Sequence, residues 1–207
     1  KANGDLYAWG ASEYGHCGIL TGSAPLPVSV IMTSVKKVAT AQGGNVGDAP
    51  HTILLTADNA LYAVGNNTNL QTGCSGSDFY TIKPVKNVPA GTIADISAGY
   101  DHTLILMENG DLYGIGNNAY GQLGSEGLGG TVGSFTKIAS GVSSMAAGRR
   151  HSLYVVNGKL YGIGDNRWNK LISSSTEKFT APVLISSGIV RVFAGEHSSF
   201  CIDERGD

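Results

Sequence analysis

A five-residue pattern, Leu-Tyr-x-x-Gly, recurs along this chain and limits what it can fold into more than any other feature. Successive copies lie about 50 residues apart, a spacing typical of repeat architectures. Asn109-Gly110 precedes the third copy and lies between two apolar runs, which predicts a two-residue β-hairpin. The chain therefore repeats one hairpin-containing unit. The four copies are LYAWG at 6–10, LYAVG at 61–65, LYGIG at 112–116 and LYGIG at 160–164.

Three further segments recur at fixed offsets from this pattern. A histidine-led apolar run precedes it, a small-residue step ending in Ala-Gly precedes that run, and a proline-led run such as KPVKNV (83–88) or APVLIS (181–186) follows. Four short β-like segments per unit of about 50 residues are typical of a propeller blade. We therefore predict an all-β fold, a single domain over residues 1–207 built as a β-propeller of about four four-stranded blades. A β-helix needs a shorter coil, and the marker residues of kelch and WD blades are absent or misplaced.

Composition agrees with a turn-rich β fold and excludes several classes of partner. The 207 residues include 30 glycines, and only 14% are charged, against about 25% in ordinary soluble domains. The net charge of −2 argues against nucleic acid as a partner. No apolar stretch is long enough to predict membrane insertion.

The three cysteines give no disulfide framework, because their number is odd and they are widely scattered. At most one bridge can form, and the pair stays open. We expect small apolar fillers, with Cys17 buried in a loop position that leucine holds in other units.

The recurring string resembles the repeat of the regulator of chromosome condensation, the RCC1 repeat. It reads A-G-x-x-H-[ST]-L, then N-G-x-L-Y-x-x-G-x-N-x-x-G-Q-L-G, and it is best preserved over residues 96–124. The resemblance implies a propeller that usually has seven blades. Four units, incomplete at both ends, are then expected to be part of a larger propeller or to associate with another chain that completes it. A closed four-bladed ring is the minor alternative.

The histidines at 51, 102 and 151 share one position of the unit. Equivalent positions in separate blades lie too far apart to converge on one ion, so we predict no metal site. We expect each of these histidines to hydrogen-bond backbone where the chain enters a strand. In the last, partial unit the same offset falls on Ser198, which displaces His197 into the variable pair before it.

That variable pair, between the glycine and the histidine, carries the candidate site. The resemblance implies that these residues line one rim of the propeller and contact a partner protein. Aromatic, basic and acidic side chains on a rigid rim suit protein binding. Trp168, in the loop position held by Tyr120 one unit earlier, is expected to pack instead. The candidate partner-binding residues are Tyr100, Asp101, Arg149, Arg150, Glu196 and His197.

No catalytic or cofactor signature accompanies this rim. The chain has no Gly-x-Ser-x-Gly and no P-loop, and its spaced glycines at 114–121 do not open a helix. We therefore predict no enzyme activity and no cofactor, and favour a non-catalytic scaffold that binds a protein partner: a small GTPase, an enzyme or a surface receptor. The alternatives are a guanine nucleotide exchange factor and a secreted enzyme-inhibitor or adhesion propeller; the compartment stays open.

Overall fold

The computed structural model describes residues 3–11, 15–18, 23–24, 30–41, 50–76, 80–124 and 130–206. Among them are three four-stranded antiparallel sheets and two two-stranded ones. Each four-stranded sheet follows the chain order of its strands. The propeller fold predicted from the repeat is confirmed, with three complete blades and a partial sheet on either side of them.

The blades are named here after the repeat units that form them. Blade two contains β3 (Val35–Thr40), β4 (His51–Thr56), β5 (Leu61–Gly65) and β6 (Lys83–Pro84). Blade three contains β7 (Ile93–Ala98), β8 (His102–Met107), β9 (Leu112–Asn117) and β10 (Thr131–Ala139). Blade four contains β11 (Val142–Ala147), β12 (His151–Val156), β13 (Lys159–Asp165) and β14 (Lys178–Ser187), with the 3₁₀ turn η1 (Arg167–Asn169) before its last strand. The partial sheets are β1 (Gly10–Ala11) with β2 (Ser23–Ala24), and β15 (Ile189–Ala194) with β16 (Ser199–Asp203).

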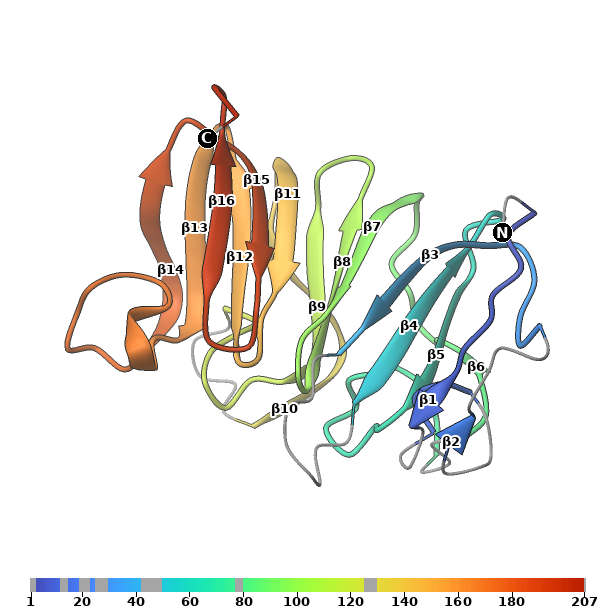
Figure 1. Cartoon of the computed structure of the whole chain (residues 1–207). Coiled ribbons are helices and arrows are strands. Elements are labelled where there is room, and N and C mark those ends of the chain that lie inside the picture. Colours follow the sequence, from blue (N-terminus) through green and yellow to red (C-terminus); the bar gives the residue numbers. More distant parts are fainter. Residues whose placement is uncertain are drawn as a thin grey trace.

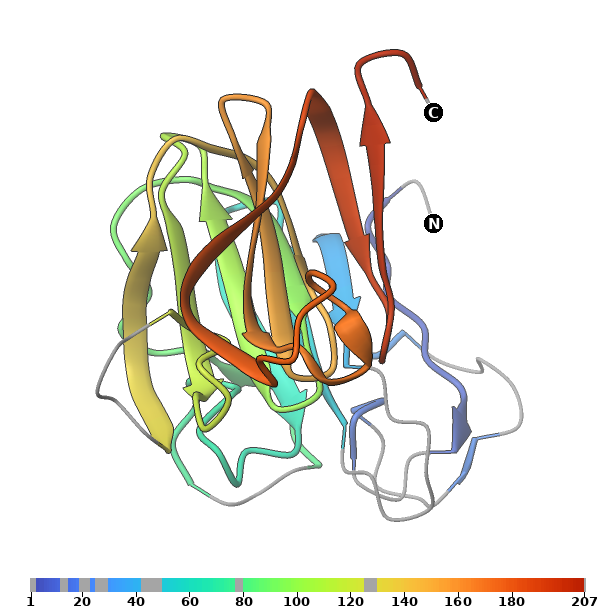
Figure 2. The same ribbon diagram turned by 90° about the vertical axis from the view of Figure 1, so that its left-hand side faces the viewer.

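The blades stand side by side around an arc (Figure 1). Their first strands β3, β7, β11 and β15 contact one another in succession, so they form the inner wall of the arc. The N- and C-termini lie at opposite ends of the row in Figure 1, and on the same side of the molecule in the turned view of Figure 2. The described part of the chain contains no helix of the length and apolarity that crossing a bilayer requires.

The second strand of each complete blade is buried along nearly its whole length, and Val156 at the end of β12 is the one partly exposed residue. Every residue of β4 and β8 is buried, in contrast to the alternating pattern of a sheet with one wet face. Neighbouring blades cover both faces of these strands, because apolar clusters form between blades two and three, between three and four, and between four and β15. The core of the protein is thus a series of inter-blade layers, which is what a propeller requires.

A repeated polar contact crosses these layers. Nε2 of His51 in blade two lies 2.8 Å from Oγ1 of Thr103 in blade three, and that hydroxyl donates to the carbonyl of Gln71 in blade two at 2.7 Å. We call this arrangement the inter-blade clasp. It recurs as His102–Ser152–Gln122 and His151–Ser199–Lys170. The histidines therefore have the expected structural role, but the prediction that their imidazole rings hydrogen-bond the backbone was wrong. They bond the hydroxyl of the next blade and not backbone.

The clasp fixes the protonation state of its histidines. Each hydroxyl has one proton, which it gives to a carbonyl, so its remaining bond must be accepted from the imidazole. The ring therefore carries a proton on Nε2; because the buried Nδ1 has no hydrogen-bond partner among the described residues, a second proton there is disfavoured and the ring is neutral. Burial lowers the pKa of His51, His102 and His151 to about 3, helped for His51 by the nearby His102.

Thr103→Val tests the clasp with a change that keeps side-chain shape. The variant leaves the N–H of His51 and the carbonyl of Gln71 without partners in a buried layer, so we expect a loss of about 2 kcal/mol in the free energy of unfolding. Thr131→Val, the same change at an exposed position of β10, is the control and should cost less than about 0.5 kcal/mol. Urea unfolding measures both. Equal losses would refute a role of the clasp in holding blades together.

The last partial unit keeps the same backbone geometry without its histidine. The carbonyl of Ser198 accepts from the N–H of Gly195 at 2.9 Å, as that of His102 does from Gly99 and that of His151 from Gly148. The predicted placement of Ser198 in the histidine position is therefore confirmed.

The three cysteines, all within the described residues, form no disulfide. Cys17 and Cys74 are partly buried and Cys201 is exposed, so the expectation of a buried Cys17 was wrong. Cys17 contacts the carbonyl of Trp9 through its sulfur.

Candidate protein-binding rim

The candidate residues lie at one edge of the blades. The loops β7–β8, β11–β12 and β15–β16, together with η1, meet at the lower edge in Figure 1. The loops β7–β8 and β11–β12 join strands of complete blades and so have a rigid base, while β15–β16 belongs to the two-stranded partial sheet. The side chains of the rim vary between units while the strands below them repeat.

Two tyrosines and three arginines alternate along this rim, and we call them the arginine–tyrosine ladder: Arg149, Tyr100, Arg150, Tyr120 and Arg167. The guanidinium carbon of Arg149 lies 4.8 Å from the ring centre of Tyr100, and that of Arg150 lies 5.9 Å from the same ring. Tyr120 receives Arg150 at 4.8 Å and Arg167 at 5.0 Å. These distances lie within the range of cation–π attraction. The ladder joins blade three to blade four.

Ion pairs hold the two ends of the ladder. Arg149 pairs with Glu196, which also lies 3.5 Å from Nε2 of the half-exposed His197. At the other end, Nε of Arg167 lies 2.9 Å from Oδ1 of Asp165. The structure thus brings Tyr100, Arg149, Arg150, Glu196 and His197, five of the six candidates from the sequence, into one surface.

Asp101, the sixth candidate, lies beneath that surface. Its side chain is buried, with the residue 4% exposed, and its carboxylate accepts from Asn117 at 2.7 Å and from Gln122 at 3.3 Å. Burial raises the pKa of Asp101, although these hydrogen bonds and the charge of Arg150 oppose the shift. Asp101 is therefore placed to support the rim from within blade three.

Blade four builds the same position with different charges. Arg150, Asp165 and Lys170 occupy the places that Asp101, Asn117 and Gln122 have in blade three. Nζ of the buried Lys170 lies 2.9 Å from Oδ2 of Asp165. Burial alone would raise the pKa of Asp165, but hydrogen bonds from Arg167 and Lys170 outweigh it and hold that pKa at about 2.

Sequence reasoning missed Tyr120, Arg167 and Trp168 as rim residues. Tyr120 belongs to the regular loop string, and Arg167 and Trp168 lie where that string is degenerate, so the only available signal was the departure from the repeat. Trp168 was expected to pack, and that was wrong. It is 81% exposed and has a φ of 69°, a left-handed conformation that bulky residues rarely adopt.

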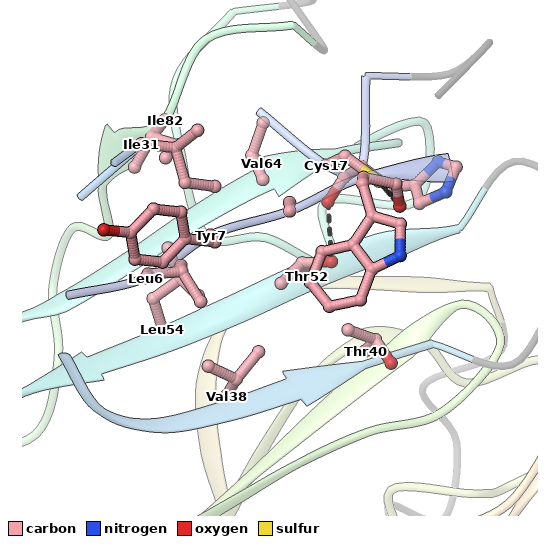
Figure 3. A pocket seen from close by; sticks show the side chains of 13 residues that line it. Leu6, Tyr7, Cys17, Ile31, Val38, Thr40, Thr52, Leu54, Val64 and Ile82 are labelled. Carbon is pink, nitrogen blue, oxygen red and sulfur yellow. Dashed lines mark hydrogen bonds between the residues drawn. The ribbon is translucent and has the colours of Figure 1, made fainter. Parts of the chain in front are cut away.

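An apolar pocket at the other end of the row is a second concave feature (Figure 3). Its volume is about 260 Å³, and it lies between residues 6–9 and blade two, with Val38, Leu54 and Val64 contributed by successive strands. The hydroxyl group of Thr52, one of the residues that line the pocket, already donates a hydrogen bond to the carbonyl of His16 at 2.8 Å. Convergent polar groups of the kind that catalysis needs are absent from its described lining. Nor do the described residues contain a group of three His, Cys, Asp or Glu side chains that could hold a metal ion.

The blades and their rim define a β-propeller repeat protein. Residues 93–122 match the family model described as the regulator of chromosome condensation (RCC1) repeat. The resemblance seen in the sequence is thereby confirmed, and residues 93–122 form an RCC1 repeat.

Comparison with known proteins agrees with that assignment. The chain is 31% identical over 126 residues to the secretion-regulating guanine nucleotide exchange factor of Bos taurus, covering 58% of this chain and 25% of that protein. It is 33% identical over 124 residues to the ultraviolet-B receptor UVR8 of Arabidopsis thaliana, covering 59% and 27%. The solved structure of Prp20p from Saccharomyces cerevisiae, studied for its binding to Gsp1p and histones, superposes with a TM-score of 0.77 at 26% identity, covering 96% of this chain and 51% of that one. The chain spans about a quarter of the length of these two curated relatives and about half of the yeast structure.

Proposed function

We propose that this chain is a non-catalytic scaffold that binds a partner protein through the rim that carries the arginine–tyrosine ladder. Tyr100, Arg149, Arg150, Glu196 and His197 would make the contacts, and Asp101 would hold the loop of blade three from beneath. The ladder is the observation that supports this proposal. It presents large, partly exposed side chains whose rotamers are already fixed by stacking and ion pairs, which lowers the entropy lost on binding.

The chemistry of the rim favours a protein over the other classes of ligand. Acidic residues pair with two of the three arginines, so the rim lacks the continuous positive charge that a nucleic-acid backbone requires. The residues with shifted pKa values are committed to structural contacts: three histidines to the clasp and Asp165 to Arg167 and Lys170. A rigid rim with structural titratable groups below it suits recognition.

Guanine nucleotide exchange on a small GTPase is the second candidate, favoured by the name of the bovine relative. It makes the same rim the binding surface and adds one activity. Release of a fluorescent GDP analogue from a GTPase captured by this chain separates the two. Faster release in the presence of the wild-type chain would establish exchange, and an unchanged rate would leave the scaffold role.

Affinity capture with matched variants tests the proposal. The rim variant carries Tyr100→Ala, Arg149→Ala, Arg150→Ala and His197→Ala. The control carries Glu108→Ala and Lys159→Ala, two exposed charges outside the rim loops. We expect a protein from the native cell extract that the wild type and the control recover equally and the rim variant recovers at least about tenfold less. Equal recovery by all three, with circular dichroism confirming that each is folded, would reject the rim as the binding surface.

A further inference from the structure

The middle rung of the arginine–tyrosine ladder differs from its two ends. Arg149 is neutralised by Glu196 and Arg167 by Asp165, but Arg150 forms no ion pair in the described part of the chain. Its guanidinium is held between the rings of Tyr100 and Tyr120, and its buried Nε has no hydrogen-bond partner. An arginine fixed in this way keeps its charge and the donors of its two terminal nitrogens for an incoming group.

The charge of Arg150 acts on Asp101, but the carboxylate of Asp101 makes its hydrogen bonds elsewhere. Asp101 uses both carboxylate oxygens on Asn117 and Gln122 of its own blade. Burial raises the pKa of Asp101, and the charge of Arg150 partly offsets that shift. Arg150 therefore has no hydrogen-bonded acid among the described residues, and the groups that match a guanidinium fork are carboxylates and phosphates.

An aromatic surface lies next to this charge along the rim. Two hollows, of about 380 and 410 Å³, share Arg167, Thr176 and Glu177; Tyr120 lines the first and Trp168 the second. Trp168 is 81% exposed and has a left-handed backbone conformation. Both the exposed indole ring and the strained backbone cost stability. An exposed tryptophan at such a site is a typical contact for an apolar side chain.

The spacing of charges favours a peptide over a phosphate backbone. Glu196, Asp165 and Glu177 lie among the arginines, and they would repel a ligand with a charge at every step. A peptide can place a single carboxylate at Arg150 and an apolar side chain at Trp168. We propose that the ladder binds an acidic segment of a partner protein, with a carboxylate on Arg150 and an apolar residue against Trp168. This inference rests on the proposed function and specifies the chemistry of its partner.

The test uses the full chain and fluorescence anisotropy. The probe is a short fluorescein-labelled peptide that carries one glutamate flanked by leucine residues. The comparison ligands are the same peptide with glutamine for glutamate, and a single-stranded oligothymidylate of equal net charge. We expect the wild type to bind the glutamate peptide more tightly than either comparison ligand. Arg150→Gln should weaken binding by about tenfold or more, and Lys159→Gln, which removes an exposed charge outside the rim loops, should leave it unchanged.

Two further variants keep the test decisive if Arg150→Gln is less stable. Arg150→Lys keeps the charge and loses the fork, so its affinity should fall between those of the wild type and Arg150→Gln. Trp168→Ala leaves the ladder intact and should weaken binding about fivefold. Equal binding by Arg150→Gln and Lys159→Gln, or equal binding of the oligonucleotide, would overturn the inference. If the glutamate peptide fails to bind while the rim variant still loses captured protein, this inference fails and the proposed function stands.

Discussion

Lowering the pH from neutrality to 5 is expected to remove about 6 kcal/mol from the free energy of unfolding. The three clasp histidines have an ordinary pKa of 6.5 once unfolded and a pKa of about 3 in the folded chain, where burial keeps them neutral. Below pH 6.5 the unfolded state binds protons that the folded state refuses, which destabilises the fold by about 1.4 kcal/mol per pH unit and histidine. At pH 5 this gives about 2 kcal/mol for each histidine, against a typical total stability of about 5–15 kcal/mol.

The direction of this effect is set by the sign of the pKa shift. Because the folded pKa is the lower one, the stabilisation is fully present above pH 6.5 and is lost as the pH falls toward 3. Asp101 acts in the opposite sense, because its pKa is higher in the folded chain than in the unfolded one. Its contribution to the free energy of unfolding therefore falls as the pH rises above 3.8. The pKa of Asp165 is lowered from 3.8 to about 2, so its contribution to the free energy of unfolding is lost only as the pH falls from 3.8 toward 2.

Urea unfolding between pH 7.5 and 5 checks this prediction. The slope below pH 6 should correspond to about three protons taken up on unfolding, and it should fall to about two in His102→Gln. Thr131→Val removes no titratable group and should leave the slope unchanged. A wild-type stability that is flat across this range would show that the clasp histidines are not neutral in the folded protein.

The repeat made most of the fold predictable. Four β segments per unit, the hairpin at Asn109-Gly110 and the histidine position could all be derived by aligning the chain with itself. The terminal proline-led run at 181–186 lies within β14, as expected. The partner of the histidine could not be derived, because the hydroxyl that it contacts is close to it only after one blade packs on the next. The Ser or Thr after each histidine repeats as clearly as the histidine does, but the sequence does not say that one unit's histidine meets the next unit's hydroxyl.

The rim was predictable in position and less so in composition. The variable pair of each unit marks the loops that face outward, and five of its residues come together. Asp101 is turned inward because Asn117 and Gln122 offer it hydrogen bonds, a contact that depends on how the following loop folds back. Tyr120 and Arg167 join the ladder from the corresponding loops of blades three and four; the sequence assigned the position of Tyr120 to packing and gave Arg167 no role.

Gly148→Ala is expected to destabilise the fold by about 3 to 5 kcal/mol. A Cβ on Gly148 would overlap the imidazole of His151, so the ring must leave its place and its bond to Ser199 is lost. The same overlap exists between Gly99 and His102. The glycine is thus required by the ring that lies on it and not by its backbone angles, for which no left-handed φ is recorded at either position.

The chain supplies its own control for this explanation. At Gly195 the histidine is replaced by Ser198, whose Oγ would lie 2.8 Å from an added Cβ and can rotate away, so Gly195→Ala should cost less than about 1 kcal/mol. Adding His151→Ser to Gly148→Ala removes the overlapping ring and copies the serine of the last unit. The double variant should then be more stable than the sum of the two single losses predicts, by about 1 to 3 kcal/mol. Strict additivity in urea unfolding would mean that Gly148 is needed for a reason unrelated to His151, and the coupling between the small residue and the histidine in each repeat would have to be abandoned.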